Sequence, residues 1–230
     1  CVFSVTCYSA DFYLIKIRLV MILPDNPKLV SFLNKLFDTN AEFATMHDNK
    51  FFAQFQDKQN PKLTILKCSD SRVQMESFDK TPQNDVFAIR NIGNQVVTNE
   101  GSIDFGIQIL KTPFLLIIGH SGCGAVEAAL SGEKTNIPAI DHELSFLNLK
   151  STCMKEAIVE NINNQVRRAM VKYQSRVKAF ELSIIGAVYD FKNDFGFGQG
   201  TVVLTNINGV TDRDIIKNKY ATEVKNLHCL

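Results

Sequence analysis

The N-terminal part of the chain carries apolar residues at helical spacing. After Asn26-Pro27, apolar side chains recur at three- and four-residue intervals, at Leu29, Phe32, Leu33, Leu36 and Phe37. This predicts a helix that begins at the Asn-Pro pair, because Asn caps helices and Pro is favoured in the first turn. A second aromatic-rich helix is predicted from about 41 to 56. Such aromatic faces pack against other surfaces, and a second subunit would provide one.

From residue 61 the pattern changes to short apolar runs that alternate with helical segments. Strands are expected at 63–68, 85–90, 114–119, 182–188 and 200–204, and helices at about 100–110, 125–130, 141–173 and 212–227. Strands that alternate with helices form βαβ units and a mainly parallel sheet. A short glycine-rich link (Gly196, Gly198, Gly200) joins the last two strands, which favours one antiparallel edge strand.

The pattern therefore predicts an α/β fold. We expect a single domain over residues 25–230, with a central sheet of about four parallel strands plus an antiparallel edge strand, flanked by helices. It includes an N-terminal helical arm at 27–58. Residues 1–24 are expected to be an extension that is non-native or disordered. The apolar run from Phe12 to Leu23 contains Lys16 and Arg18 and is too short to cross a bilayer, so no stable membrane insertion is expected; attachment to a membrane surface is the alternative.

Composition adds constraints on partners and compartment. Of the 230 residues, 45% are hydrophobic and 21% are charged, as in ordinary soluble proteins. Lys and Arg number 25 against 24 Asp and Glu, so the net charge of +1 offers no electrostatic basis for binding nucleic acid. Four cysteines lie outside the motifs discussed below, at Cys1, Cys7, Cys153 and Cys229. They are too scattered for a disulfide framework, which indicates free thiols and a cytoplasmic location.

Two neighbouring strand ends carry metal-binding residue types. The strand at 63–68 ends in Cys68-Ser-Asp-Ser-Arg72, and the strand at 114–119 is followed by His120-Ser-Gly-Cys-Gly124. Open α/β sheets bind ligands at the carboxyl ends of their strands. Two thiolates and one imidazole suit Zn²⁺, and three protein ligands leave a fourth position for water or substrate. Neither motif offers a fourth Cys or His, which points to a catalytic site.

Asp70 and Arg72 add a second group to this site. Residues two apart in an extended segment project to the same side, so Asp70 can approach the ion while Arg72 binds its carboxylate. The pairing keeps Asp70 ionised, and an ionised carboxylate can accept a hydrogen bond from metal-bound water. The helix that begins near Gly124 places its positive end beside the site, which favours anionic ligands.

Taken singly, these residues have ordinary structural explanations. A buried Cys usually acts as a small hydrophobe, and a single His usually packs or caps. The joint occurrence at two adjacent strand ends, with an Asp-Arg pair attached, favours zinc. Other motif readings fail: the segment Gly119-His-Ser-Gly-Cys123 ends in Cys where a nucleophile elbow requires Gly, and no Walker loop or dinucleotide fingerprint occurs.

At these residues the chain resembles the β-class carbonic anhydrases. The resemblance rests on the segments 68–73 (CSDSRV), 90–94 (RNIGN), 102–106 (SIDFG) and 119–124 (GHSGCG), and more weakly on 185–190 (IGAVYD). It covers about residues 27–205. It implies an enzyme, carbonate dehydratase, that reversibly hydrates CO2 to bicarbonate and a proton on one Zn²⁺ per subunit. The implied ligands are Cys68, His120 and Cys123, and Asp70 with Arg72 would orient the zinc-bound hydroxide.

The resemblance also implies substrate contacts and an assembly. Substrate-binding positions would be Gln59, Phe87, Ile92, Phe105 and Gly124, with the aromatic and aliphatic side chains forming an apolar wall for CO2; Phe105 stands where a Tyr is common. One arrangement in the family lets the aspartate close the site and relies on a Trp before the first Cys. This chain has no Trp and carries Ile65 in that region, so the open arrangement is expected. The family's dimers, often paired further, imply a homodimer or dimer of dimers held by the arm at 27–56.

Two alternatives remain open from the sequence. The same scaffold resembles enzymes that hydrolyse carbonyl sulfide or carbon disulfide. A non-catalytic zinc module, used for assembly or redox sensing through Cys68 and Cys123, is the other. The Asp70–Arg72 pair argues against the second, because a purely structural site has little need of it.

Overall fold

The computed structural model describes residues 26–230, which form two compact units with a boundary between Gln56 and Asp57. The expected extension at 1–24, with its apolar run, lies outside the described residues. The first unit contains the N-terminal arm and the second contains the sheet domain. No helix within 26–230 combines the length and apolarity needed to cross a membrane.

The arm consists of α2 (Pro27–Met46) and α3 (Asn49–Ala53). Asn26 caps α2, since its side chain accepts a hydrogen bond from the backbone N–H of Lys28 at 3.0 Å. The predicted break near residue 41 is wrong, because the helix continues to Met46 through residues that include no breaker. The chain turns instead at His47, and Asp48 caps α3 by accepting from the N–H of Phe51 at 2.9 Å.

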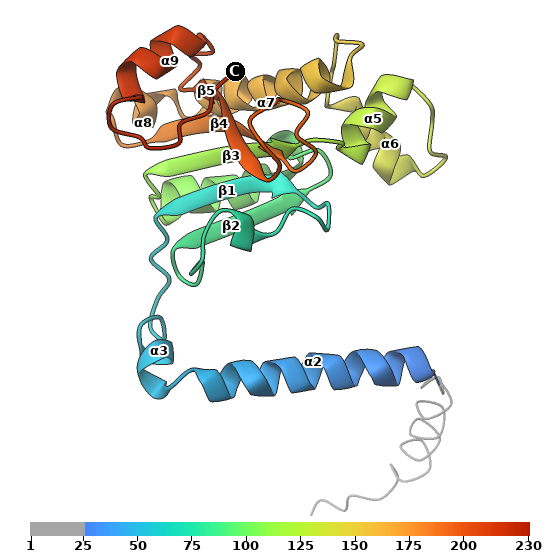
Figure 1. Cartoon of the computed structure of the whole chain (residues 1–230), viewed down its shortest axis with the longest axis vertical. Coiled ribbons are helices and arrows are strands. Elements are labelled where there is room, and N and C mark those ends of the chain that lie inside the picture. The colour runs from blue at the N-terminus through green and yellow to red at the C-terminus, as the bar shows by residue number, and fades with distance from the viewer. Residues whose placement is uncertain (1–25) are drawn as a thin grey trace, which may run out of the picture. The chain divides into compact units, whose positions relative to one another are not determined.

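The second unit is built on one five-stranded sheet, drawn in Figure 1. Its strands are β1 (Leu63–Cys68), β2 (Val86–Asn91), β3 (Phe114–His120), β4 (Ser183–Asp190) and β5 (Thr201–Ile207). Their order in the sheet is β2-β1-β3-β4-β5, with four parallel strands and β5 antiparallel to β4. The predicted α/β fold class, including the antiparallel edge strand, is confirmed.

The helices of this unit connect the strands. They are α4 (Glu100–Asp104), the π-helical turn η3 (Phe105–Ile109), α5 (Gly124–Ser131), α6 (Pro138–Ser145), α7 (Met154–Lys172), α8 (Gln174–Lys178) and α9 (Arg213–Tyr220), with short 3₁₀ turns η1 (Met75–Ser77) and η2 (Val97–Asn99). The single helical region expected at 141–173 is wrong: it is two helices, separated at Asn148, whose φ of 47° is left-handed. The tail helix also ends earlier than predicted, at Tyr220.

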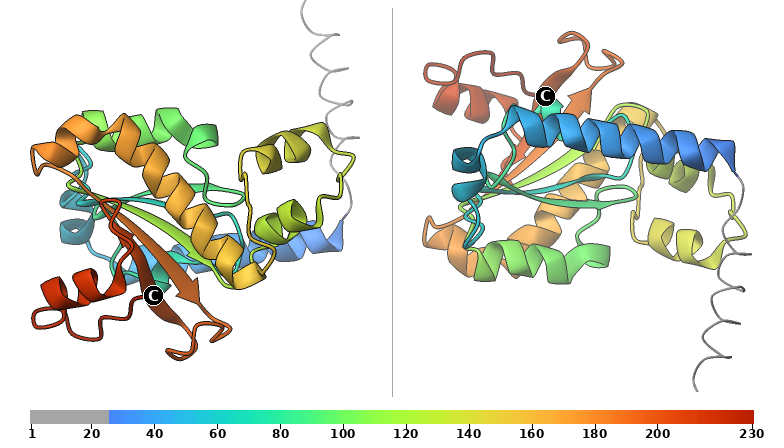
Figure 2. Two further views of the ribbon diagram at one scale, coloured as in Figure 1. Left: turned by 90° about the horizontal axis from the view of Figure 1, so that it is seen from above. Right: turned by 90° about the horizontal axis from the view of Figure 1, so that it is seen from below.

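The two faces of the sheet are covered differently. On one face α7 packs on β3 and β4, and the core there includes Leu66, Ile117 and Ile162. Figure 2 shows α7 crossing this face with the 100–110 segment beside it. The smaller core of the other face contains Ile65 and Ile118. Since side chains alternate along β1, its last residue, Cys68, lies on the α7 face.

Candidate metal centre

Three buried ligand atoms meet at the carboxyl ends of β1 and β3. Cys68 is the last residue of β1, His120 is the last residue of β3, and Cys123 directly precedes α5. The two strands are neighbours in the sheet, so residues 52 or more positions apart in the chain become adjacent. Their sulfur and nitrogen ligand atoms all lie within 4.8 Å of one another. The structure thus brings together the three residues that the motifs singled out.

The two sulfurs interact directly, with Sγ of Cys68 3.9 Å from Sγ of Cys123. The contact with Cys123 lowers the pKa of the Cys68 thiol, with further help from His120 and from backbone N–H groups, although burial opposes this. The same contact, together with burial, raises the pKa of Cys123. Proximity thus moves the pKa values of the two thiols in opposite directions, and a divalent cation that contacted both sulfurs would favour the thiolate form of each.

His120 is oriented as a ligand would be. Its Nδ1 lies 3.0 Å from the carbonyl oxygen of Ser121, and because a carbonyl can only accept, Nδ1 carries the hydrogen. The lone pair is therefore on Nε2, which is buried and has no hydrogen-bond partner among residues 26–230. A buried acceptor without a partner is costly unless something else binds it. Two sulfurs and this nitrogen form a donor set that fits zinc.

The loop between the second and third ligands requires a glycine. Gly122 has a φ of +61°, and a Cβ there would lie 2.6 Å from Nζ of Lys192. Its carbonyl oxygen accepts a hydrogen bond from Nη2 of Arg72 at 3.1 Å. The backbone N–H of Lys192 in turn donates to Oγ of Ser121 at 3.1 Å. The ligand loop is thus bonded both to the Arg72 loop and to the chain that follows β4.

Asp70 and Arg72 form a bidentate ion pair beside the cluster. Nη2 of Arg72 lies 2.6 Å from Oδ2 of Asp70, and both Nε and the backbone N–H of Arg72 donate to Oδ1 at 2.9 Å. These hydrogen bonds hold the pKa of Asp70 well below its usual range, against a smaller effect of burial. Oδ2 of Asp70 lies 3.8 Å from Nε2 of His120. An ionised carboxylate therefore stands at the edge of the donor set.

Phe191 is a further residue of this site that sequence reasoning missed. Its ring stacks on that of His120, and the guanidinium carbon of Arg72 lies 4.7 Å from the centre of the same ring. Phe191 directly follows β4, whose Tyr189 pairs in register with His120. The only signal in the sequence was an aromatic residue after a predicted strand, and which neighbour it would meet depends on the strand order.

The match to a known family model decides the family. A model described as carbonic anhydrase matches residues 63–196 and includes all the residues of the cluster and the dyad. The chain belongs to the carbonic anhydrase family. Its relatives and its structural neighbours place it in the β class of that family.

Curated relatives include several carbonic anhydrases. One from Mycolicibacterium smegmatis is 33% identical over 114 residues, which are 46% of this chain and 55% of that protein. Beta carbonic anhydrase 3 of Arabidopsis thaliana is 28% identical over 162 residues, 58% of this chain and 62% of that protein. The chain thus spans about 55–62% of the length of these relatives.

Solved β-carbonic anhydrases share the fold. The structure of the β-carbonic anhydrase CcaA has a TM-score of 0.66 at 22% identity and covers 78% of this chain and 95% of that one. A structure from a study of two tetrameric β-carbonic anhydrases of Sordaria macrospora has a TM-score of 0.64 at 20% identity, covering 77% of this chain and 96% of that one. At such identities the likeness concerns the fold.

The residues expected to bind substrate in this carbonic anhydrase are more dispersed than the metal cluster. The rings of Phe87 and Phe105 pack together, with centroids 5.8 Å apart. Phe87, however, pairs in register with Thr64, four residues before Cys68 along β1. At about 3.3 Å per residue this is about 13 Å from the cluster, so the chain by itself does not bring the aromatic pair to its own metal ligands.

The remaining expected positions lie at different distances from the strand ends. Ile92 directly follows β2, is half-buried, and lines a cavity of about 360 Å³ with Ser69 of the dyad loop. Gly124 opens α5, and no atom lies within 4 Å of the position a Cβ would take there. Gln59 is exposed in the segment before β1. Roles for all three remain predictions.

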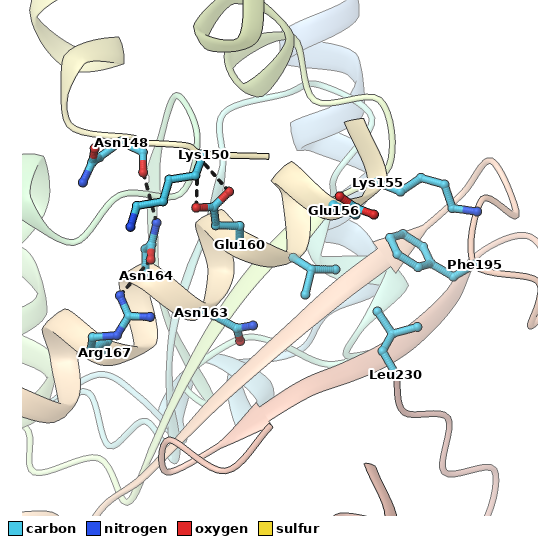
Figure 3. A pocket seen from close by; sticks show the side chains of 11 residues that line it. Asn148, Lys150, Lys155, Glu156, Glu160, Asn163, Asn164, Arg167, Phe195 and Leu230 are labelled. Atoms are coloured by element: carbon cyan, nitrogen blue, oxygen red, sulfur yellow. Dashed lines mark hydrogen bonds between the residues drawn. The ribbon is translucent and has the colours of Figure 1, made fainter. Parts of the chain in front are cut away.

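A separate cavity of about 670 Å³ is lined by residues of α7 and of the segments beside it (Figure 3). Lys150, Glu156, Glu160 and Arg167 are among the residues that line it, and Cys68, His120 and Cys123 are not. Despite its volume, this cavity is therefore not assigned to the chemistry of the metal centre.

Proposed function

We propose that this protein catalyses the reversible hydration of CO2 to bicarbonate and a proton, with Zn²⁺ held by Cys68, His120 and Cys123. The observation that carries the proposal is the buried set of three ligand atoms within 4.8 Å, which includes Nε2 of His120, an atom with no hydrogen-bond partner in the described part of the chain. Zinc with three protein ligands acts as a Lewis acid and makes water a nucleophile near neutral pH. Membership of the carbonic anhydrase family supports this activity.

Asp70 orients the attacking group in this proposal. An ionised carboxylate accepts hydrogen bonds and donates none, so Asp70 would accept a hydrogen bond from the O–H group of the nucleophile. This bond would direct the lone pair of the nucleophile toward CO2. Arg72 donates three hydrogen bonds to the same carboxylate. Because these bonds keep Asp70 attached to Arg72, they support the open arrangement, in which Asp70 is not itself a fourth ligand.

The N-terminus of α5 favours the product. Cys123 is the N-cap residue of this eight-residue helix, and Gly124 begins its first turn. The free N–H groups and the positive end of the helix dipole stabilise negative charge, which bicarbonate carries and CO2 lacks. With no side chain at Gly124, an anion can approach this backbone closely.

A homodimer or dimer of dimers completes the proposal. None of the residues of α2 is buried, and Phe32 and Phe37 are 59% and 66% exposed. Such a large exposed apolar surface is typical of a protein–protein interface. The separation of Phe87 and Phe105 from their own cluster supports an assembly in which this pair lies near the cluster of a partner. The substrate remains a small molecule, CO2 or bicarbonate.

Replacing Asp70 tests the catalytic part of the proposal. Asp70→Ala is expected to keep one zinc per chain and to lose most CO2 hydration, measured by stopped flow with a pH indicator. Asp57→Ala, a change at an exposed aspartate outside the site, is the matched control and keeps full turnover. Equal CO2 turnover in the wild type and Asp70→Ala, or none in the wild type, would refute it. Turnover of carbonyl sulfide above that of CO2 would assign the chain to the alternative hydrolase.

A further inference from the structure

A lysine is buried next to the first ligand. Lys67, one residue before Cys68 in β1, is 1% exposed and projects to the opposite face of the sheet from Cys68. Its neighbours on β1 on that face are apolar, as Ile65 shows. Burying an amine there is costly unless it is hydrogen-bonded, so the contact it makes is informative. Nζ of Lys67 donates to the carbonyl oxygen of Val73 at 2.6 Å.

Val73 closes the turn that carries the dyad. The backbone N–H of Val73 donates to the carbonyl oxygen of Asp70 at 3.0 Å, which closes a four-residue turn over 70–73. Asp70 and Arg72 are both members of this turn. Val73 is itself fully buried, so its carbonyl group is removed from water and depends on the bond from Lys67.

A second basic side chain holds the other end of the turn. Arg90 pairs in register with Lys67 across β1 and β2. Its Nη2 donates to the carbonyl oxygen of Asp70 at 2.8 Å, and its Nε donates to that of Cys68 at 3.2 Å. Side chains at paired positions of adjacent strands project from the same face of the sheet. Two neighbouring strand residues thus hold the first and last carbonyl groups of the turn.

We propose that Lys67 is a positioning residue, which acts through the backbone of Val73 to hold Asp70 and Arg72 in their catalytic arrangement. The hydrogen bond, the burial of both partners and the second bond from Arg90 carry the inference. The amine donates in either protonation state, so its action requires no change of charge. The inference rests on the proposed carbonic anhydrase function for its catalytic consequence, and on the turn alone for its structural part.

The test compares wild type with Lys67→Met, which keeps the length of the side chain and removes the donor. Amide hydrogen exchange, followed by mass spectrometry on zinc-loaded protein, is expected to be about tenfold faster or more at the 70–73 turn and unchanged in β3. Zinc content stays at one per chain, and kcat for CO2 falls about tenfold, because the dyad is displaced. Lys62→Met, at an exposed lysine that pairs with Asp85, is the matched control and changes neither measurement.

Each outcome decides the inference. Unchanged exchange at the turn overturns it, and so does faster exchange across the whole sheet, which indicates a general loss of stability. Faster exchange confined to the turn with an unchanged kcat overturns the catalytic part. If wild type itself fails to hydrate CO2, the proposed function fails, and the exchange data still decide whether Lys67 holds the turn. If Lys67→Met does not fold, a crystal structure of the wild type decides: Nζ beyond 4 Å from the Val73 oxygen overturns the inference.

Discussion

The rings of His120 and Phe191 lie nearly parallel, with centroids 5.8 Å apart and planes 22° apart. The guanidinium carbon of Arg72 lies 4.7 Å from the centre of the same phenyl ring. One aromatic side chain therefore contacts both a proposed metal ligand and the cation that holds Asp70. Neither contact is a hydrogen bond, so their contributions come from packing and from the attraction between a cation and a ring.

Phe191→Leu is expected to lower kcat about two- to fivefold while zinc remains bound. The cation–ring contact contributes about 0.5–1 kcal/mol at a partly exposed site, and its loss frees Arg72 from one of its restraints. Stopped-flow CO2 hydration and metal analysis measure the two quantities. Phe197→Leu, which alters a ring that packs on His228, is the control. A kcat equal to wild type in Phe191→Leu would show that the ring does not position Arg72.

Cys123→Ser is expected to lose stoichiometric zinc. The serine hydroxyl is a poor ligand for zinc compared with a thiolate, and only Cys68 and His120 remain of the three-donor set. Cys153→Ser provides a matched control, because Cys153 is exposed and lies outside the cluster. The zinc content of the two variants after dialysis against metal-free buffer distinguishes them. Retention of one zinc per chain by Cys123→Ser would contradict the assigned ligand set.

Gly106→Ala is expected to destabilise the fold by about 1–3 kcal/mol. A Cβ at Gly106 would collide with Oγ1 of Thr64 and lie 3.1 Å from Phe87. Thr64 is buried and its hydroxyl is hydrogen-bonded to that of Thr112 at 2.8 Å, so it cannot simply rotate away. Urea unfolding measures the change in the free energy of unfolding.

Gly101→Ala is the matched change in the preceding helical turn. A Cβ at Gly101 would have no atom within 4 Å, so this variant should be as stable as wild type or more stable by about 0.5 kcal/mol. Similar losses in the free energy of unfolding of both variants would mean that the π-helical turn does not pack closely on β1.

Glu160→Gln is expected to lower the free energy of unfolding by about 1 kcal/mol at pH 7, because a charged acceptor is replaced. The Glu160 carboxylate accepts from the backbone N–H of Lys150 at 3.0 Å (Figure 3) and from that of Ser151 at 2.9 Å. Burial opposes its ionisation, but these donors outweigh burial and lower the pKa of Glu160.

The pH dependence has a definite sign. A carboxyl group whose pKa is lowered on folding stabilises the protein fully above its unfolded pKa, about 4.3, and loses that stabilisation as the pH falls through the folded value. The difference between wild type and Glu160→Gln should therefore shrink between about pH 5 and the lowered pKa. Urea unfolding at pH 7 and near pH 4 measures it, with Glu156→Gln in the same cavity as the control. A difference that grows as the pH falls would be the wrong sign.

Local patterns predicted the elements that depend on local chemistry. The strand at 63–68 was predicted with the bounds that the structure has, since a short buried run followed by Ser and Asp is unambiguous. The helix bounds were less accurate near residue 41 and between 145 and 154. At these places the end of a helix depends on a single residue that caps the next helix, as Asp48 does, or adopts a left-handed conformation, as Asn148 does. The periodicity of apolar residues does not predict which residue will do so.

By itself the sequence determined the alternation of strands and helices, the three soft donors, and the Asp-Arg spacing, because each is a property of neighbouring residues. Only the tertiary structure decided that the end of β4 would place Phe191 against His120, that Lys67 would reach Val73, and that Phe87 of β2 would pair with Thr64, about 13 Å before Cys68 along β1. These contacts depend on strand order, register and the face to which a side chain points. All three are set by the packing of the whole sheet, which no single segment of the chain determines.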